Sequence, residues 1–262
     1  KILCIFSMGY VLVVSPFGLP VLLLQTLLAF TMARAFHHYE SRKKLLLIFT
    51  IGMQVGILLV CRYAQGNRTI IDSPIFLGIS FYTLVLIGYV FDVYKGTFPA
   101  VQNFGELFLF SSFFPLLIAG PIERAKSLLP QLLEAKNFNP FNIRRGCELI
   151  LWGIFKKLVM ANQLALLVDR RFADLNSIPT LGLVFAIYAY AFQLCFDFSG
   201  YTDIARGAAR VFGVDVLANF HLPYSAKSLT DFWRRWHISL SSWLKDYVYI
   251  PLGGGRVVPW RK

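Results

Sequence analysis

The chain alternates between long apolar stretches and short polar segments. Residues 2–33 contain no charged residue, but Pro16, Gly18 and Pro20 interrupt them. A helix that crosses a bilayer needs about 20 mostly apolar residues, and a proline disturbs a helix interior. This first stretch therefore predicts one membrane span together with a second short or broken segment.

Three further uncharged runs, at residues 45–61, 73–91 and 175–196, are also long enough to span a bilayer. The first two form a predicted hairpin whose loop, residues 62–72, we expect outside the cell. Residues 34–44 carry four basic residues and one acid. Because basic segments beside spans stay in the cytoplasm, we place residues 34–44 there.

The apolar run at residues 107–122 breaks this alternation, because it is short and contains Pro115, Gly120 and Pro121. If it crossed the bilayer, residues 123–148 would lie outside with five basic residues, against the positive-inside rule. We therefore predict a re-entrant or interfacial segment. Its irregular backbone must be buried in protein or line a wet cavity.

Residues 149–168 form another predicted span, with Lys156 and Lys157 in its middle. Charged side chains are costly at that depth in a membrane. Two interpretations stay open: the lysines face an aqueous cavity, or the segment consists of two helices that meet at the interface.

Composition supports a polytopic all-α membrane protein. Hydrophobic residues make up 56% of the chain and charged residues 15%, where soluble domains carry about 25%. The mean hydropathy is +0.59. The net charge of +12 comes from basic clusters between apolar runs, which is typical of loops beside anionic lipid. Membrane lipid is therefore an expected partner and nucleic acid is not.

The four cysteines, at positions 4, 61, 147 and 195, lie apart from one another in or beside apolar stretches. Without CxxC spacing, disulfide and zinc interpretations are weak, and buried small apolar side chains are favoured. We predict no metal site.

Polar residues gather where the last apolar run ends: Gln193, Asp197, Ser199, Tyr201 and Asp203. Ionisable groups at membrane depth normally face a pocket or pair with a cation. The alternative is an ordinary helix end, where Asp and Ser cap the next element. The residues alone leave these two interpretations open.

A capping-box pattern at Ser228 and Asp231 predicts that a helix begins near residue 229 or 230. Aromatic and aliphatic residues with basic flanks on one helix are typical of an amphipathic helix at the membrane interface. The apolar side is predicted to hold Trp233, Trp236, His237, Leu240 and Leu244, and the basic residues that project elsewhere are Arg234, Arg235 and Lys245.

His237 is the candidate for chemistry on this helix, beside Ser239 and Ser241. An imidazole can accept a proton from a hydroxyl near neutral pH. A desolvated site with aromatic walls keeps it neutral, as a general base requires. The alternative is a core histidine whose hydrogen bonds are satisfied and which has no role in catalysis.

The stretch TDFWRRWHISLSSWLKDYVYIPLGG resembles the signature of the membrane-bound O-acyltransferase superfamily, in particular its bacterial branch with alginate O-acetyltransferase. The blocks LGISFYTLVLIGYVFDVYKG, FFPLLIAGPIERAKSLLPQL and FQLCFDFSGYTDIARGAARVFG with NFHLPY are similar to family blocks in family order. The resemblance covers residues 75–255. It implies N-terminal transmembrane helices at residues 1–72 and a family core at residues 73–262 whose C-terminal part is missing.

The resemblance implies a polytopic helical bundle in the plasma (inner) membrane, with re-entrant and interfacial helices around a central tunnel. It implies an enzyme with no bound cofactor that moves an acyl group, usually acetyl, from a cytoplasmic thioester donor. That donor would be acetyl-CoA or an acyl carrier protein. The acceptor would be a hydroxyl of an extracytoplasmic polysaccharide or cell-wall glycan, beside a periplasmic or extracellular esterase-like partner. D-alanyl transfer to teichoic acid from a carrier protein, and a transporter without catalysis, stay as alternatives.

The family uses two histidines, and His237 matches the first, in the WHxSL element. The second belongs to a WHG-type element beyond Lys262, so we expect a longer protein. Hydrogen-bond donors to an oxyanion or substrate are expected at Asn219, Ser239 and Ser241. Arg234 and Arg235 suit a carrier phosphate or lipid headgroups, and Asp231 suits the helix cap. The further residues with expected substrate-binding or tunnel-lining roles are Gln193, Asp197, Ser199, Tyr201, Asp203, Asp231, Trp233, Arg234, Arg235 and Trp236.

Overall fold

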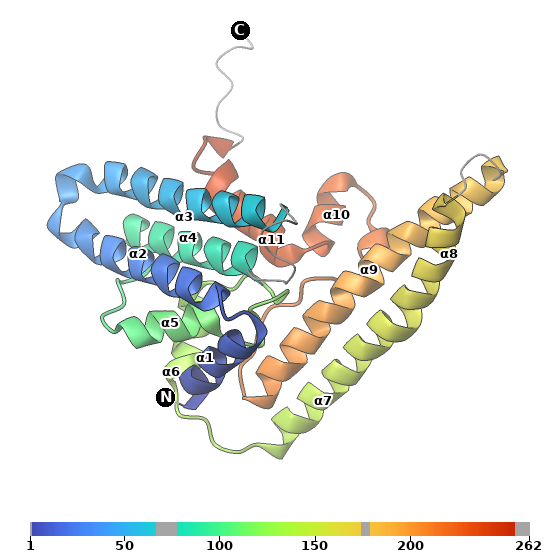
Figure 1. Ribbon diagram of the computed structural model, residues 1–262, viewed down its shortest axis with the longest axis horizontal. Helices are drawn as coiled ribbons and strands as arrows, with labels where there is room; N and C mark the ends of the chain where they lie inside the picture. The colour runs from blue at the N-terminus through green and yellow to red at the C-terminus, as the bar shows by residue number, and fades with distance from the viewer. Residues whose placement is uncertain (1, 67–77, 174–178, 255–262) are drawn as a thin grey trace, which may run out of the picture. The chain divides into compact units, whose positions relative to one another are not determined.

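The computed structural model describes residues 2–66, 78–173 and 179–254, and every regular element within them is a helix (Figure 1). The predicted all-α membrane class is confirmed. The chain forms two compact units. The first unit comprises Lys1–Ile118, Ile122–Ala135 and Ile238–Lys262, and the second comprises Ala119–Pro121 and Lys136–His237. This division follows packing, so the predicted division at residue 72 stays a prediction.

In the first unit, the predicted break after the first apolar segment is confirmed, because the helix stops at Val14 and a new one starts at Gly18, around Pro16. Helix α2 packs against α3, α4 and α5. The helices of this unit are α1 (Ile2–Val14), α2 (Gly18–His38), α3 (Lys43–Gly66), α4 (Ile79–Lys95), α5 (Phe104–Ser112), α6 (Ala125–Leu133) and α11 (Ile238–Leu244), with short turns η1 (Glu40–Arg42) and η4 (Lys245–Tyr249).

Side-chain amides join the long helices of the first unit. Gln25 of α2 and Gln54 of α3 each donate to the other's backbone carbonyl, at 3.3 and 2.9 Å. Thr83 of α4 donates to the amide oxygen of Gln25 at 2.8 Å. All three residues are fully buried. Such bonds between apolar helices add association energy where the hydrophobic effect between lipid-facing helices is weak.

The basic segment at residues 34–44 is mostly helical. Helix α2 continues to His38 and α3 begins at Lys43, with η1 between them. His37 and His38 are exposed and lie in the last turn of α2.

In the second unit, two long helical segments pack against each other. Helix α7 (Pro140–Ile154), the π-helical turn η2 (Phe155–Ala161) and α8 (Asn162–Phe172) form one run, and α9 (Thr180–Val211) packs along it (Figure 1). The alternative of two helices meeting at an interface is therefore wrong. The expected helix end near Asp197 is also wrong, because α9 continues to Val211.

Glycine pairs bring these two segments into close contact. A Cβ atom on Gly153 would lie 2.6 Å from the carbonyl oxygen of Gly200, and one on Gly146 would lie 2.7 Å from that of Gly207. The partners run in opposite order along the two helices, so α7 and α9 are antiparallel. Small residues allow backbones of membrane helices to approach this closely.

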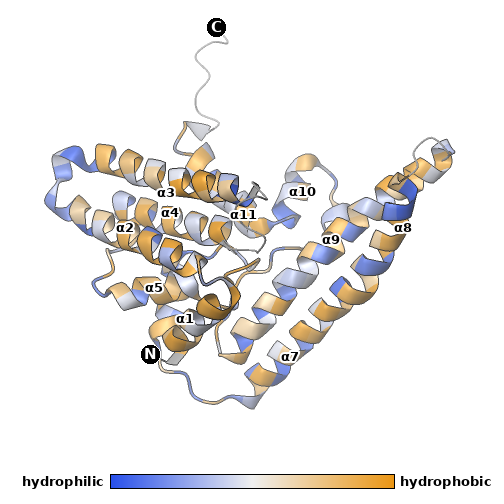
Figure 2. Cartoon of the chain, viewed as in Figure 1, coloured by the Kyte–Doolittle hydropathy of each residue, from blue (hydrophilic) through white to orange (hydrophobic). Residues whose placement is uncertain are grey.

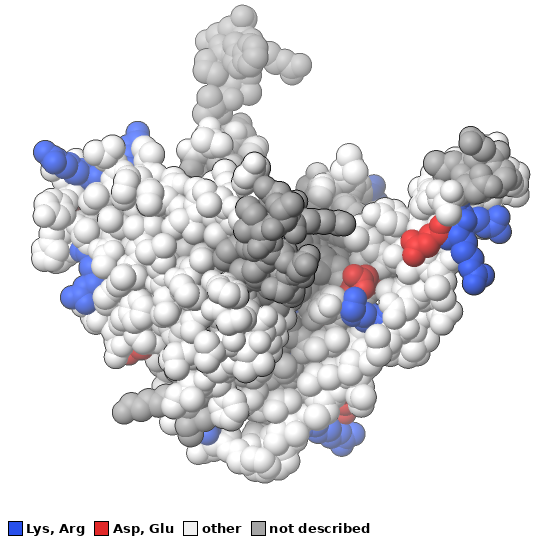
Figure 3. All heavy atoms as spheres, in the orientation of Figure 1, with Lys and Arg blue, Asp and Glu red and all other residues white. Residues whose placement is uncertain are grey.

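Within the residues that the structure describes, four helical segments are long and apolar enough to cross a membrane: Gly18–His38, Glu40–Gln65, Pro140–Phe172 and Thr180–Val211. Large apolar side chains on them are exposed, and most of the face drawn in Figure 3 carries no charge (Figures 2 and 3). Helix α4, at 17 residues, is slightly shorter, and the start of its predicted span lies outside the described residues. These exposed apolar surfaces suit lipid.

Helix α5 (Phe104–Ser112), which overlaps the start of the segment predicted to be re-entrant or interfacial, has only nine residues. Such a helix is about 13 Å long, whereas the hydrocarbon core is about 30 Å thick. It does not cross a bilayer as one helix. The sidedness of this segment, like the central tunnel, stays a prediction.

Two of the cysteines predicted to be buried, Cys61 and Cys195, are buried, and Cys4 is half-buried. Cys147 is exposed, so the prediction is wrong there. It lies on α7, which is largely exposed along its length because the apolar surface of this helix has no protein cover in the described residues.

The close approach of α7 and α9 predicts the effect of Gly153→Ala. The new methyl group would lie 2.6 Å from the Gly200 carbonyl oxygen. Alanine favours a helix by about 1 kcal/mol, but overpacking costs about 1–3 kcal/mol, so we expect a lower melting temperature in detergent. Gly56→Ala on α3 meets nothing within 4 Å and should leave the temperature unchanged or raise it. Equal melting temperatures of the two variants would contradict the packing.

Candidate functional site

His237 lies at a break between two helices. Helix α10 (Leu229–Arg235) ends before Trp236, which is extended, and His237 has a φ of +42° before α11 begins at Ile238. The predicted single helix with Trp233, Trp236, His237, Leu240 and Leu244 on one side is therefore wrong. The carbonyl of Arg235 accepts a hydrogen bond from the backbone N–H of His221 at 2.9 Å, which replaces the helical partner that would have continued α10.

The left-handed conformation of His237 is strained, because positive φ is uncommon for residues other than glycine. Strain of this kind costs about 1–3 kcal/mol and is often found at functional sites. The conformation places the imidazole at the turn between the helices and not on the face of either.

A row of aromatic rings begins beside His237 in the second unit. The ring of Phe198, from α9, meets the imidazole edge-to-face with centroids 4.7 Å apart. The ring centroids of Phe198 and Phe220 are 5.2 Å apart, and those of Phe220 and Trp236 are 4.9 Å apart. The predicted aromatic-walled environment is confirmed.

The imidazole of His237 is neutral at pH 7. Burial lowers its pKa from 6.5 to about 4. Its Nδ1 atom is buried and has no hydrogen-bond partner within the described residues. The site therefore holds an uncharged imidazole with one ring nitrogen not bonded to the described protein.

The predicted cap of α10 is confirmed. The hydroxyl of Ser228 accepts a hydrogen bond from the N–H of Asp231 at 3.1 Å, and Asp231 accepts one from the N–H of Lys227 at 3.3 Å. Arg235 donates to Asp231 at 2.9 Å and to the hydroxyl of Ser225 at 3.3 Å. The hydrogen bond from Arg235 lowers the pKa of Asp231.

These contacts separate the two arginines of α10. Arg235 is committed to the cap by its bond to Asp231, whereas Arg234 is exposed. Trp233 is also exposed, at 54%, and its ring contacts Phe232 at 5.5 Å. Arg234 and Trp233 are therefore the members of this predicted set that face outward.

The polar residues of α9 pair with the lysines of η2. Lys156 forms an ion pair with Asp203 and donates to the hydroxyl of Ser199 at 3.2 Å. Arg206 binds the other oxygen of Asp203 at 3.1 Å. Of the two interpretations of these α9 residues, pairing with a cation is correct, and capping of a following element is wrong.

Lys157 pairs with Asp197 in the same way, and its ammonium group lies 4.2 Å from the ring centre of Tyr201. Both lysines pair with α9, and the aqueous cavity around them stays a prediction. Side-chain exposure is 11% for Lys156 and 14% for Asp203, against 26% and 43% for Lys157 and Asp197. Loss of one partner from a buried pair costs about 3–5 kcal/mol, so the first pair matters more for the fold.

The other predicted residues fall into both units. Gln193 and Asn219 belong to the second unit; Asn219 is 1% exposed, and the amide oxygen of Gln193 is buried. Ser239 and Ser241 belong to the first unit. The hydroxyl of Ser239 accepts a hydrogen bond from the N–H of Ile122 at 3.0 Å. In the described contacts this hydroxyl therefore fixes the segment after α5.

A charged cluster in the first unit escaped the sequence analysis. Arg124 pairs with Asp246 at 2.9 Å and lies 4.3 Å from the ring centre of Tyr247. Tyr247 donates to Asp92 at 2.9 Å. These residues line a cavity of about 580 Å³. The sequence did carry a signal, since all four residues lie within the blocks that resemble the family, but none of the four had been given a role.

Comparison with known proteins identifies the family of this chain. A family model described as MBOAT, membrane-bound O-acyltransferase family, matches residues 101–258. The chain therefore belongs to the membrane-bound O-acyltransferase family, as its motifs predicted. The matched residues contain His237, the α7–α9 contacts and three members of the charged cluster, Arg124, Asp246 and Tyr247; the fourth member, Asp92, lies before the matched range.

Three relatives illustrate the similarity. A probable alginate O-acetylase of Pseudomonas aeruginosa is 46% identical over 181 residues, which is 69% of this chain and 34% of that protein. A peptidoglycan O-acetyltransferase of Helicobacter pylori is 40% identical over 207 residues, covering 69% and 39%. A teichoic acid D-alanyltransferase of Bacillus subtilis is 29% identical over 177 residues, covering 67% and 45%. The chain thus spans less than half the length of these relatives.

The lowered pKa of His237 predicts how stability depends on pH. In the unfolded chain the imidazole takes up a proton below pH 6.5, whereas in the folded protein it stays neutral down to about pH 4. The unfolded state therefore binds more protons in this window, and stability falls as the pH decreases from 6.5 to 4. His237→Gln should lose this contribution, so the melting temperature of the variant relative to the parent should rise between pH 7.5 and pH 5.

His221→Gln is the control, because His221 is exposed. Its melting temperature should follow that of the parent protein at both pH values. If the difference between His237→Gln and the parent is the same at pH 7.5 and pH 5, the imidazole is not buried as described.

Proposed function

We propose that the protein is an O-acyltransferase that moves an acetyl group from a thioester donor to a hydroxyl of a polysaccharide or cell-wall glycan. The observation that carries this proposal is the difference in sequence identity between two groups of relatives. Relatives named for O-acetyl transfer are 46% and 40% identical to the chain, whereas the relative named for D-alanyl transfer is 29% identical.

The environment of His237 supports a specific role in this reaction. An acceptor hydroxyl needs a base before it attacks the thioester carbonyl, and a base works best when its pKa is near the working pH. With a pKa of about 4, His237 is a weak base at pH 7. The neutral imidazole is better suited to orient a second, stronger base or to donate a hydrogen bond to the tetrahedral intermediate. The family's second histidine is the proposed base.

The proposed substrates follow from the reaction. The donor is acetyl-CoA or an acyl carrier protein on the cytoplasmic side, used as a substrate and not as a bound cofactor. Gln193 and Asn219, which lie in the same unit as His237, are proposed to contact substrate, and exposed Arg234 is proposed to meet a phosphate of the donor or a lipid headgroup. A periplasmic or extracellular esterase-like protein is the proposed partner in delivery to the glycan.

Acetyl transfer by reconstituted full-length protein tests the proposal. With labelled acetyl-CoA or acetylated carrier protein outside and glycan inside vesicles, label should appear as an alkali-labile ester on the glycan. Entry of label without ester formation would identify a transporter. Transfer from a D-alanyl carrier protein and not from the acetyl donors would identify the D-alanyl branch. Either result would overturn the proposal.

We place the protein in the plasma membrane as a multi-pass protein with residues 34–44 in the cytoplasm. Four candidate spans and the basic residues between α2 and α3 support this placement. Ser41→Cys, in a background where the four native cysteines are replaced, should resist membrane-impermeant thiol reagents in intact cells and react after permeabilisation. Rapid labelling in intact cells would contradict this orientation.

His237→Gln tests the role of the imidazole in the full-length protein. Glutamine keeps one hydrogen bond and much of the volume, but it cannot reproduce both ring nitrogens of the imidazole. We expect acetyl transfer to fall by at least about 10²-fold, which is the lower range for loss of one hydrogen-bond donor to a tetrahedral intermediate. Expression and melting temperature at pH 7.5 should change little.

The matched control for this experiment is His221→Gln, which should retain activity because His221 is exposed and only its backbone N–H is bonded to Arg235. If His237→Gln folds normally and keeps near-parental activity, His237 is structural. If this variant does not accumulate, His237→Asn provides the same comparison with a smaller side chain.

A further inference from the structure

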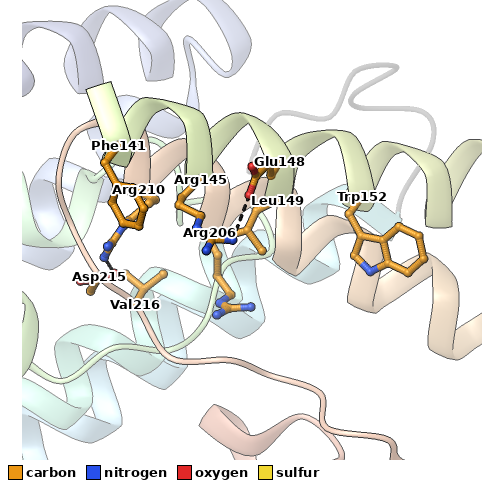
Figure 4. Close-up of a pocket in the computed structure, with 9 residues that line it drawn as sticks. All are labelled: Phe141, Arg145, Glu148, Leu149, Trp152, Arg206, Arg210, Asp215 and Val216. Carbon is orange, nitrogen blue, oxygen red and sulfur yellow. Dashed lines mark hydrogen bonds and ion pairs between the residues drawn. The ribbon is translucent and has the colours of Figure 1, made fainter. Parts of the chain in front are cut away.

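A cleft in the second unit combines arginines with exposed aromatic rings. It has a volume of about 520 Å³ and lies between α7, along which its lining extends from Phe141 to Trp152, and the last turns of α9 (Figure 4). Arg145 and Trp152 of α7 line it, together with Arg206 and Arg210 of α9. It lies wholly within the second unit and does not include His237.

The cationic side chains around this cleft exceed the carboxylates that they bind. Glu148 is shared by two arginines: Arg144 donates to it at 3.0 Å and Arg145 at 3.1 Å. Asp203 is likewise shared by Arg206 and Lys156. Arg210 pairs with Asp215, whose side chain is 72% exposed. The lining of the cleft itself contains three arginines and two carboxylates, Glu148 and Asp215, which leaves an excess of positive charge for an anion.

The register of α7 and α9 places Arg145 and Arg206 at the same height along the axis of the helix pair. Gly146 and Gly207 are in backbone contact, and Arg145 and Arg206 are their neighbours in sequence. All three lining arginines lie outside the most apolar parts of α7 and α9, at the same end of the antiparallel pair. In a membrane, we expect this charged end of the pair to lie at the level of the lipid phosphates.

An apolar surface continues from the arginines along α7. Trp152 is 54% exposed and stacks on Phe155 with ring centroids 5.5 Å apart. Leu151 is 66% exposed beside them. A soluble phosphate ligand has no use for this surface beyond the cleft, whereas an acyl chain would cover it.

We propose that this cleft binds an anionic phospholipid, with the phosphate against Arg145, Arg206 and Arg210 and an acyl chain along Trp152 and Phe155. Arginine suits this role because its planar guanidinium group makes paired hydrogen bonds to phosphate oxygens. The inference rests on the membrane location and on the cleft, and it is independent of the acetyl-transfer reaction. The bound lipid would fasten the ends of α7 and α9, whose ion pairs and glycine contacts hold the wall behind His237.

Fluorescence quenching by brominated lipids tests the site. The full-length protein is placed in phosphatidylcholine nanodiscs, and brominated phosphatidylglycerol or brominated phosphatidylcholine is added at equal mole fractions. Trp152 is one of five tryptophans in the chain, so its signal is obtained as the difference between the parent and Trp152→Phe. We expect the Trp152 signal to be quenched at a lower mole fraction of the glycerol lipid than of the choline lipid.

Arg145→Gln with Arg210→Gln is the main variant, because Arg145 is exposed and the partner of Arg210 is exposed, so the fold should tolerate both changes. The preference for phosphatidylglycerol should fall about fivefold for each arginine removed. Arg206→Gln is the second variant; Asp203 keeps Lys156 as a partner in it. Arg170→Gln with Arg171→Gln, at the other end of the same helical run, is the matched control and should keep the preference.

Three results would overturn the proposal: equal quenching of Trp152 by the two lipids, an unchanged preference in Arg145→Gln with Arg210→Gln, or the same loss in the control. A competition arm distinguishes the source of the phosphate. Soluble glycerol phosphate and coenzyme A at millimolar concentration should leave the quenching by phosphatidylglycerol unchanged. If coenzyme A removes it, the cleft is a site for a soluble phosphate ligand and the lipid assignment is wrong.

Discussion

The antiparallel contact between α7 and α9 is the constraint on which the described site depends. Glycine pairs let the two backbones touch, and the touching backbones bring Lys156 and Lys157 within reach of Asp203 and Asp197. Close packing and charge pairing therefore require each other. A larger residue at either glycine pair would separate the helices and leave charges without partners in an apolar environment, where each is costly.

This contact also positions the wall of the histidine site. Asp197 faces η2 through its ion pair, and the next residue of α9, Phe198, lies about 100° further round the helix. Phe198 is the residue whose ring meets His237 edge-to-face. Because α9 is held by its polar face, the adjacent aromatic face cannot rotate freely. The neutral imidazole thus depends on ion pairs that it does not touch.

The sequence alone predicted the features that depend on residues close together along the chain. The break at Pro16, the cap at Ser228 and the long apolar helices follow from local rules of helix formation. The continuation of α9 past Asp197 did not follow, because its polar residues are satisfied by a helix about 40 residues earlier in the chain. The glycine register that creates those pairs is visible only once the two helices are placed together.

The helix break at His237 is a second feature that local sequence did not predict, and its cause is a backbone hydrogen bond to a residue outside the helix. The residues around it favour a continuous amphipathic helix, and the helix is interrupted because the N–H of His221 takes the carbonyl of Arg235. That competition costs helical hydrogen bonding and forces a positive φ on a histidine. Its result is an imidazole at a turn, with Nδ1 buried and its pKa lowered by aromatic walls, which a helix face exposed at the interface would not provide. The strained turn and the desolvated imidazole are therefore two consequences of one tertiary hydrogen bond, and a rule based on helical periodicity could not have found either.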